Sequence, residues 1–165
     1  MKTVLIIPAL NEERAIGHVL SEVPRGIYAQ IIVGSRVLGE AEPGALGPHQ
    51  RLGNALATFL IRLWQGFRYT DLGPFRAIRA SSLSVIGMAD PNYGWTIEMQ
   101  MKALRHSLRV KEVPVSYRNH RWGASKVSGT FSGSVKAGSK ILWTFFRLAL
   151  ANRGDGKRVY NNPRP

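Results

Sequence analysis

The sequence predicts an α/β domain in which a mainly parallel sheet is flanked by helices. The apolar, partly β-branched run 3–7 stops at Pro8, which is typical of a strand buried on both faces of a parallel sheet. A helical pattern follows it, and the apolar triplet 31–33 then predicts a second short strand. This β-α-β order is a common opening of an α/β domain.

The first predicted helix covers about residues 11–23. Asn11 is a suitable N-cap, and the two glutamates after it interact favourably with the helix dipole. Apolar residues recur at helical spacing as far as Val23, and a proline and a glycine then end the helix.

The remainder of the chain predicts further helices and strands. Pro114 cannot donate a backbone hydrogen bond, so its strand is expected at an edge of the sheet or with a bulge. In chain order we expect a helix over 50–64, a strand over 75–78, helices over 81–86 and 95–107, the edge strand over 110–117, a loop over 118–133, and a helix over 134–151.

The helix expected over 50–64 carries one apolar stripe, and two interpretations of it stay open. Such a stripe more often faces a protein core than a membrane, so the core interpretation ranks first. Flanking arginines and aromatic residues keep an interfacial orientation open. The stripe consists of Leu52, Leu56, Phe59, Leu60, Leu63 and Trp64, with Arg51 and Arg62 outside it.

Composition limits the functional classes. The chain has 165 residues, enough for one domain over 1–151, and the Gly-, Pro- and Arg-rich tail 152–165 is expected to be disordered. Its net charge of +13 favours phosphate-bearing partners. The absence of cysteine excludes disulfides, thiol catalysis and cysteine-based metal sites. With no signal-like N-terminus and no run of about 20 apolar residues, we expect a cytoplasmic protein, peripheral on a membrane at most.

Four polar clusters stand where predicted strands end and helices begin, which is where open α/β sheets bind ligands. Glycine permits close approach to a ligand, and arginine offers a fork of donors that suits phosphate. Each cluster alone has a sufficient structural explanation, such as a helix cap or a turn. The clusters are 7–13, 34–36, 71–76 and 116–126.

Taken in order, the clusters resemble the motifs of family 2 glycosyltransferases. The most similar branch is the dolichol- or polyprenyl-phosphate mannosyl- and glucosyltransferases. The resemblance covers most of the chain from Thr3 to about Thr144. Its carriers are Pro8 with Asn11 and Glu12, then 34–36, 71–76, 93–98, 113–118 and 123–129.

The resemblance implies a GT-A fold, which is Rossmann-like, and transfer of a sugar from a nucleotide sugar of the GDP-mannose or UDP-glucose type. The acceptor would be a polyprenyl or dolichyl phosphate at a membrane surface, with the 50–64 helix on the bilayer. A Mg²⁺ or Mn²⁺ ion would bridge the donor diphosphate to an Asp-x-Asp motif. The implied donor-nucleotide residues are Pro8, Asn11 and Glu12, and the implied phosphate- or acceptor-binding residues are Ser35, Arg36, Arg76, Arg118, Ser125 and Lys126.

This sequence departs from the family pattern in its acidic residues. The second strand with its acidic turn and the strand that carries Asp-x-Asp have no counterpart, so we infer an internal deletion near 24–31. Without those carboxylates the metal lacks ligands, and we expect weak or no transferase activity. Glu98 and Asp71 are candidate site carboxylates, but for Glu98 a solvated residue or an ion-pair partner of an arginine ranks first. For Asp71 a turn former ranks first, and a ligand or an arginine-orienting residue second.

Two other classes of function stay open. One is a non-catalytic basic module that binds anionic lipid or polyprenyl phosphate, with the basic set Arg36, Arg76, Arg118, Arg121 and Lys126. The other is a nucleic-acid binder, which we rank last because no reading helix, zinc finger or aromatic RNA platform is recognisable. The sequence predicts neither the sugar nor the oligomeric state.

Overall fold

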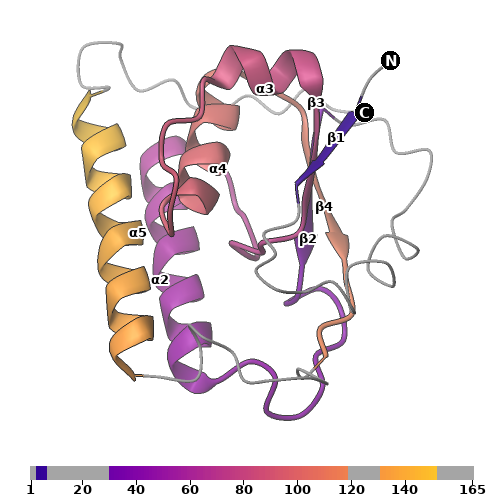
Figure 1. The fold of residues 1–165 in the computed structure, drawn as a ribbon, viewed down its shortest axis with the longest axis vertical. Coiled ribbons are helices and arrows are strands. Elements are labelled where there is room, and N and C mark those ends of the chain that lie inside the picture. Colours follow the sequence, from indigo (N-terminus) through magenta and orange to yellow (C-terminus); the bar gives the residue numbers. More distant parts are fainter. Residues whose placement is uncertain (1–2, 7–29, 119–130, 152–165) are drawn as a thin grey trace.

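The computed structural model describes residues 3–6, 30–118 and 131–151. Within them, a four-stranded sheet in the order β1-β3-β2-β4 is covered on one face by helices (Figure 1). The strands are β1 (Thr3–Ile6), β2 (Ile31–Ser35), β3 (Arg76–Arg79) and β4 (Val110–Pro114). The helices are α2 (Pro48–Gln65), α3 (Ala80–Ile86), α4 (Trp95–Arg105) and α5 (Phe131–Ala151).

The α/β class is confirmed, but the expectation of a mainly parallel sheet is wrong. β3 runs antiparallel to both of its neighbours, β1 and β2, and only β2 and β4 pair in parallel. The cause is the connection after α2. Side-chain bonds from Asn54 to Thr70 and Leu72 hold the segment 67–72 against the helix, so the chain returns before it enters β3. An apolar run predicts a strand but not the direction of its neighbour.

The interpretation of the α2 stripe as a core face is wrong for four of its six residues, whereas Leu60 and Trp64 are half-buried and pack against the core. The side of α2 that packs inward carries Ala57, Thr58, Ile61 and Gln65. The other four residues of the predicted stripe point away from the sheet: Leu52, Leu56, Phe59 and Leu63, called the exposed stripe below, are between 45% and 73% exposed. Polar anchors explain the rotation, because Gln65 donates to Met101 O at 2.9 Å and Asn54 holds the return segment. These amides lie on the same side of the helix as Ala57 and Ile61.

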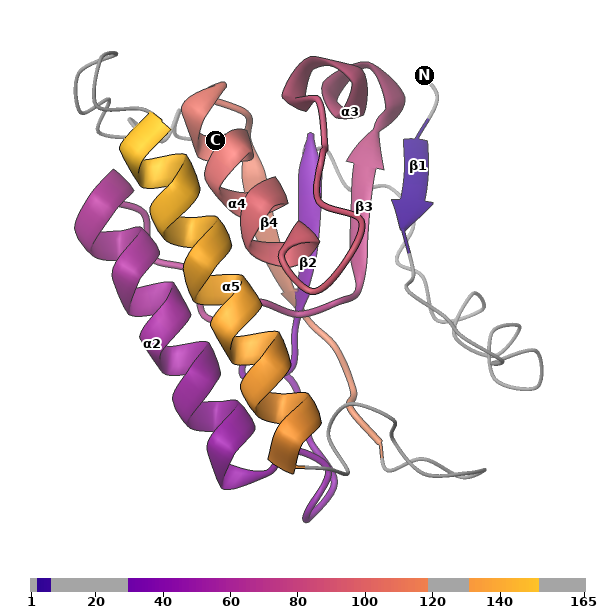
Figure 2. The same ribbon diagram turned by 60° about the vertical axis from the view of Figure 1, so that its left-hand side comes forward.

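The core lies between the sheet and the inner faces of α2, α4 and α5. Ile31, Val33 and Ile78 from the sheet and Ile61 and Ile97 from the helices are at most 1% exposed. In both views α2 and α5 lie side by side as an outer layer (Figures 1 and 2). This layer holds α4 against the sheet, and one face of α2 and α5 is left uncovered by the residues that the structure describes.

Most other element predictions are confirmed within a few residues. α2 begins at Pro48, since proline suits the first turn of a helix, and it ends at Gly66, whose φ of 77° favours glycine. β4 is an edge strand, as Pro114 indicated, although it ends there and not at 117. The predicted helix over 11–23, the tail 152–165 and most of the loop 118–133 lie outside the described residues.

Candidate functional site: an arginine-lined groove beside α2

A cavity of about 640 Å³ lies between α2, the loop that follows β2, and the return segment 67–72. Four arginines line it, and no Asp or Glu is found among the described residues of its wall. The rest of the wall is small, apolar or uncharged. We call this cavity the arginine groove, after Arg36, Arg51, Arg62 and Arg68.

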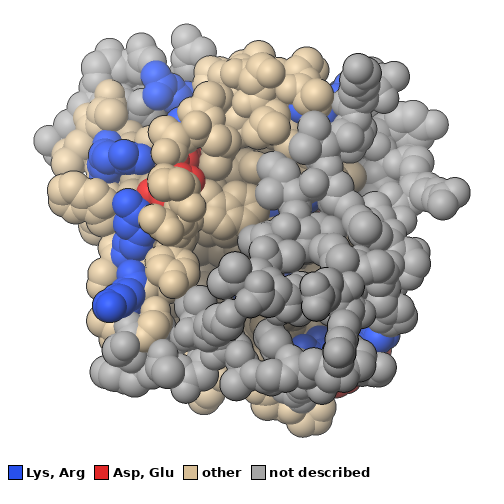
Figure 3. Space-filling view, in the orientation of Figure 1, with Lys and Arg blue, Asp and Glu red and all other residues tan. Residues whose placement is uncertain are grey.

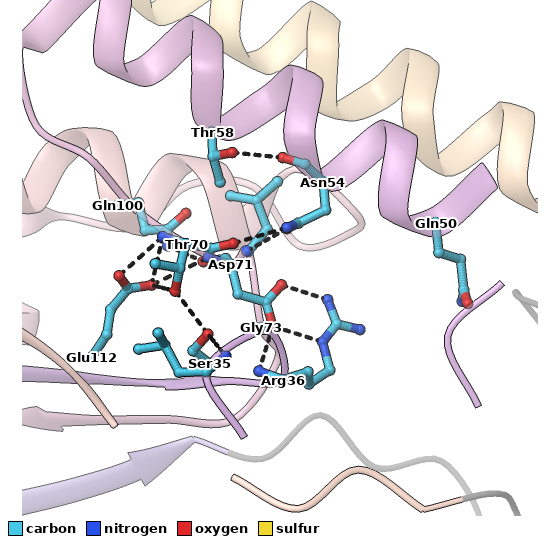
Figure 4. Close-up of polar contacts among 12 residues, drawn as sticks. Ser35, Arg36, Gln50, Asn54, Thr58, Thr70, Asp71, Gly73, Gln100 and Glu112 are labelled. Atoms are coloured by element: carbon cyan, nitrogen blue, oxygen red, sulfur yellow. Dashed lines mark hydrogen bonds and ion pairs between the residues drawn. The ribbon is translucent and has the colours of Figure 1, made fainter. Parts of the chain in front are cut away.

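One of these arginines is held rigidly by a buried carboxylate. Asp71 Oδ2 accepts hydrogen bonds from the backbone N and the Nε of Arg36, both at 2.8 Å, and Asp71 Oδ1 accepts from Arg36 Nη2 at 2.7 Å (Figure 4). The Arg36 guanidinium also lies 5.3 Å from the ring centroid of Tyr117. Burial opposes the charge of Arg36, but the bonds to Asp71 outweigh it and raise the pKa of Arg36. The guanidinium is therefore a fixed cation at the wall of the groove.

A second carboxylate, from β4, supports the turn that carries Asp71. Glu112 accepts bonds from Thr70 N, from Thr70 Oγ1 and from Asp71 N at distances of 2.9 to 3.2 Å. Thr70 Oγ1 also lies 2.7 Å from the buried hydroxyl of Ser35. Burial, the largest effect, raises the pKa of Glu112. The end of β2 and the middle of β4 are thus linked to the turn through one polar network (Figure 4).

Amide side chains from two helices complete the network. Asn54 donates to Thr70 O at 3.0 Å and accepts from Leu72 N at 2.8 Å, while Gln100 donates to Asp71 O at 2.8 Å. Sequence reasoning missed Asn54, Gln100 and Glu112 as site residues. Asn54 was detectable in part, because asparagine is a poor former of helix interiors and often marks a side-chain contact.

Close backbone approach makes glycine necessary in this turn. A Cβ on Gly73 would collide with Gly34 O, and one on Gly39 would collide with Val115 O. Gly73 thus lets the loop after α2 approach the end of β2, and Gly39 lets the loop after β2 approach the segment that follows β4. The sequence-predicted turns 34–36 and 71–76 therefore meet in space, and Ser35, Arg36 and Asp71 come together as a cluster.

Arg76 lies elsewhere. It is fully buried, donates from Nε to Gly73 O at 2.9 Å and from Nη1 to Thr96 O at 2.6 Å, and stacks 5.2 Å from the Trp95 ring centroid. Its Nη2 has no hydrogen-bond partner, and burial lowers the pKa of Arg76 to about 10. Arg76 does not line the arginine groove, although the charges of Asp71 and Arg36 still act on it.

Glu98 is also remote from the groove. Its buried carboxylate accepts bonds from the backbone N of Asp90 at 2.7 Å and of Ala89 at 3.2 Å, and pairs with Lys102 at 2.8 Å. Asp90 in turn pairs with Lys140 of α5 at 3.1 Å. Burial would raise the pKa of Glu98, but the bonds from Lys102, Asp90 and Ala89 outweigh it and lower that pKa. These contacts join the start of α4 to α5.

The other predicted site residues divide into two groups. Arg118 ends the described segment and does not line the groove. Pro8, Asn11, Glu12, Ser125 and Lys126 lie outside the described residues. Within the described part of the chain, no group of three or more His, Cys, Asp or Glu side chains could hold a metal ion.

Comparison with known proteins now gives the site a context. The chain is 32% identical over 87 residues to an uncharacterized glycosyltransferase of Mycobacterium tuberculosis, a match covering 53% of this chain and 40% of that protein. It is 25% identical over 150 residues to the undecaprenyl-phosphate mannosyltransferase of Micrococcus luteus, covering 86% of this chain and 59% of that protein. The chain is related to these glycosyltransferases.

A third relative extends the relationship to archaea. The low-salt glycan biosynthesis hexosyltransferase Agl6 of Haloferax volcanii is 29% identical over 91 residues, covering 54% of this chain and 22% of that protein. The chain therefore spans less than two thirds of the length of each of these three relatives. No family model and no solved structure matches the chain.

Proposed function

We propose that this chain binds a polyprenyl phosphate at a membrane surface, as the acceptor of glycosyl transfer. The observation that carries the proposal is the arginine groove, where Asp71 fixes the Arg36 guanidinium and Arg51 approaches from α2. Arginine forks match phosphate oxygens, and a wall without carboxylates does not repel them. The Micrococcus relative, named for undecaprenyl phosphate, supports the same class of acceptor.

The chemistry of the proposed transfer needs little from a general base. An oxygen of the acceptor phosphate attacks the anomeric carbon of a nucleotide sugar of the GDP-mannose or UDP-glucose type. The bond from that carbon to the donor diphosphate breaks, and the nucleoside diphosphate leaves. The attacking phosphate is already ionised at neutral pH, so positioning and charge neutralisation by arginines are the main contributions. The proposed donor and reaction rest on the relationship to the glycosyltransferases named above. The GT-A fold is proposed on the same basis.

A divalent metal does not fit the residues that the structure describes. Mg²⁺ and Mn²⁺ need several oxygen ligands, and the two carboxylates nearest the groove are engaged: Asp71 by Arg36, and Glu112 by Thr70. We therefore propose that the chain, shortened near 24–31, binds the acceptor but transfers sugar weakly or not at all. This is the function of a non-catalytic basic module derived from an enzyme.

The uncovered face of α2 and α5 supports a membrane surface as the location. Neither helix contains an acidic residue, and both expose large apolar side chains beside basic ones. Basic side chains also lie along the left of Figure 3, the side on which Figure 1 draws the helices. In the described residues no helix is long and apolar enough to cross a membrane. Besides the exposed stripe of α2, the apolar side chains are Val135, Trp143, Phe146 and Leu150.

The test measures binding to vesicles that contain a polyprenyl phosphate or the uncharged polyprenol. We expect the phosphate to bind more tightly, and Arg51→Ala to weaken it about 10- to 100-fold, as for a charged hydrogen bond. Arg109→Ala is the matched control, because Arg109 is exposed and lies outside the groove. Equal binding of phosphate and alcohol would refute the proposal.

The proposed lack of activity has its own test. The full chain is mixed with polyprenyl phosphate, labelled GDP-mannose or UDP-glucose, and Mn²⁺ or Mg²⁺, and product lipid is extracted. We expect acceptor binding with little or no transfer. Metal-dependent transfer by the pure chain would overturn the inactivity and leave acceptor binding intact.

A further inference from the structure

The arginine groove is longer than one phosphate requires. Arg51 and Arg62 both line it, and they stand eleven positions apart on α2. At a rise of about 1.5 Å per residue, their backbones are separated by roughly 16 Å along the helix axis. A single phosphate group spans only a few ångströms, so it cannot contact both ends. The Arg36 and Arg51 end can be filled by an acceptor phosphate while the other end stays open.

The other end has its own pair of cations. Arg62 comes from the last turn of α2, and Arg68 from the return segment that the bonds of Asn54 hold against the helix. Both are exposed, and neither side chain forms a hydrogen bond or ion pair with the part of the chain that the structure describes. By contrast, Arg36 is bound to Asp71, and Arg51 donates to Leu46 O at 3.2 Å. Arg62 and Arg68 therefore keep all of their donors available for a ligand.

The position of the groove on α2 favours a lipid headgroup over a free anion. At about 100° per residue, the groove face lies between the buried face and the exposed stripe, roughly 100° from each. Phe59 belongs to both the groove and the stripe. The groove face carries Arg51, Ala55 and Arg62, the stripe Leu52, Leu56 and Leu63, and the buried face Ala57, Ile61 and Gln65.

This arrangement matches the two ends of an amphiphile. Apolar tails next to the exposed stripe would place a phosphate headgroup at the height of the adjoining groove. A helix without acidic residues adds no repulsion to an anionic headgroup. A soluble phosphate would not need the apolar border.

We propose that Arg62 and Arg68 form a second anion subsite, which binds the phosphate headgroup of an anionic phospholipid while the Arg36 end holds the polyprenyl phosphate. The inference rests on the proposed acceptor site, because it assigns the remainder of the same groove. Anionic lipid would then bind at a defined position, in addition to its diffuse attraction to the positive charge of the chain. Acceptor and phospholipid then occupy the groove together.

Soluble probes test whether the subsites are separate. Geranyl phosphate represents the acceptor, and dihexanoyl phosphatidylglycerol, used below its micelle concentration, represents the phospholipid. We expect both to bind by calorimetry, and saturating geranyl phosphate to leave the affinity for phosphatidylglycerol unchanged. Competition between the two probes, or no saturable binding of phosphatidylglycerol, would overturn the second subsite.

Paired variants separate this inference from the acceptor site. Arg62→Ala with Arg68→Ala should abolish phosphatidylglycerol binding and leave geranyl phosphate binding unchanged, whereas Arg51→Ala should do the reverse. If Arg51→Ala has no effect but the double variant does, the acceptor proposal fails and the second subsite stands. Arg79→Ala with Arg109→Ala carries the same charge change outside the groove. If that control loses as much phosphatidylglycerol binding, the attraction is only diffuse and the subsite is refuted.

The same variants give a membrane readout. On vesicles of equal parts phosphatidylcholine and phosphatidylglycerol, the double variant should bind about 30-fold more weakly, from about fivefold per basic residue near an anionic surface. On pure phosphatidylcholine it should bind as the unmodified chain does. An equal loss on both kinds of vesicle would contradict headgroup recognition. Thermal unfolding of each variant confirms that the fold is retained.

Discussion

Asp71 holds Arg36 at three points, although 35 residues separate them in the sequence. The carboxylate is fully buried, and the arginine side chain keeps 15% of its surface exposed. Because the guanidinium is fixed before any ligand arrives, little side-chain entropy is lost on binding. The acid of this turn therefore orients an arginine, an interpretation that the sequence ranked second, after a turn former.

Asp71→Asn should destabilise the chain and weaken anion binding. The amide keeps the shape but not the charge, and it leaves a partly buried guanidinium without its counter-ion. We expect a loss of about 3 kcal/mol in the free energy of unfolding, measured in urea. Glu40→Gln, at an exposed position, is the control and should change it by less than about 0.5 kcal/mol. Equal stability of both variants would show that the Arg36 contact contributes nothing.

Two glycine substitutions should act in opposite directions. Gly73→Ala places a methyl group against Gly34 O, a backbone atom that cannot easily move. We expect the free energy of unfolding to fall by about 2 to 3 kcal/mol, and anion binding at the Arg36 end of the groove to weaken. Gly53 lies inside α2, and an added methyl group would meet nothing within 4 Å, so Gly53→Ala should raise the free energy of unfolding by about 1 kcal/mol. Denaturation midpoints of the two variants measure this contrast, and the same sign for both would contradict it.

The Glu98 contacts predict a pH dependence of stability. Because folding lowers the pKa of Glu98, its contribution is present above the ordinary carboxyl pKa and is lost as pH falls through the lowered value. Glu98→Gln removes this contribution. The variant should be less stable at neutral pH, and the difference in unfolding free energy should shrink on acidification. A difference that is constant with pH would refute this role for the carboxylate.

Glu112 should respond in the opposite sense. Burial raises the pKa of Glu112, so ionising this carboxyl is less favourable in the folded chain than in the unfolded chain. Its contribution to the free energy of unfolding therefore falls as pH rises above the ordinary carboxyl pKa. Glu112→Gln keeps an acceptor for Thr70 and removes the charge. Between mildly acidic and neutral pH, the variant should therefore lose less stability than the unmodified chain does. Parallel stability curves for the two proteins would contradict the prediction.

The exposed stripe should serve a surface contact and not folding. Leu52→Ser and Leu63→Ser change side chains that are 73% and 72% exposed, so we expect unfolding free energies within about 0.5 kcal/mol of the unmodified chain. Binding to vesicles should weaken, because each substitution removes apolar area from the contact with the membrane. Ile61→Ser, on the buried side of α2, is the contrasting variant and should unfold the chain. Unchanged vesicle binding by the stripe variants would place the membrane contact elsewhere.

The sequence alone predicted the α/β class, the strand at 31–33, the helix after the β2 loop and the edge position of the Pro114 strand. These features follow from local patterns, namely apolar runs, helical periodicity and the missing amide of proline. The glycine turns with Ser35, Arg36 and Asp71 were also visible as candidates. The spacing of residues predicts these features because they depend on residues that are close to one another in the sequence.

Only the tertiary structure decided the direction of β3, the face of α2 that is buried, and the pairing of Arg36 with Asp71. The direction of β3 depends on a return segment tied by Asn54, a contact across 16 residues. The burial of α2 follows from amide anchors and small residues that outweigh a more hydrophobic stripe. Long-range hydrogen bonds of buried polar groups are obligatory once those groups leave water, yet no local pattern records their partners.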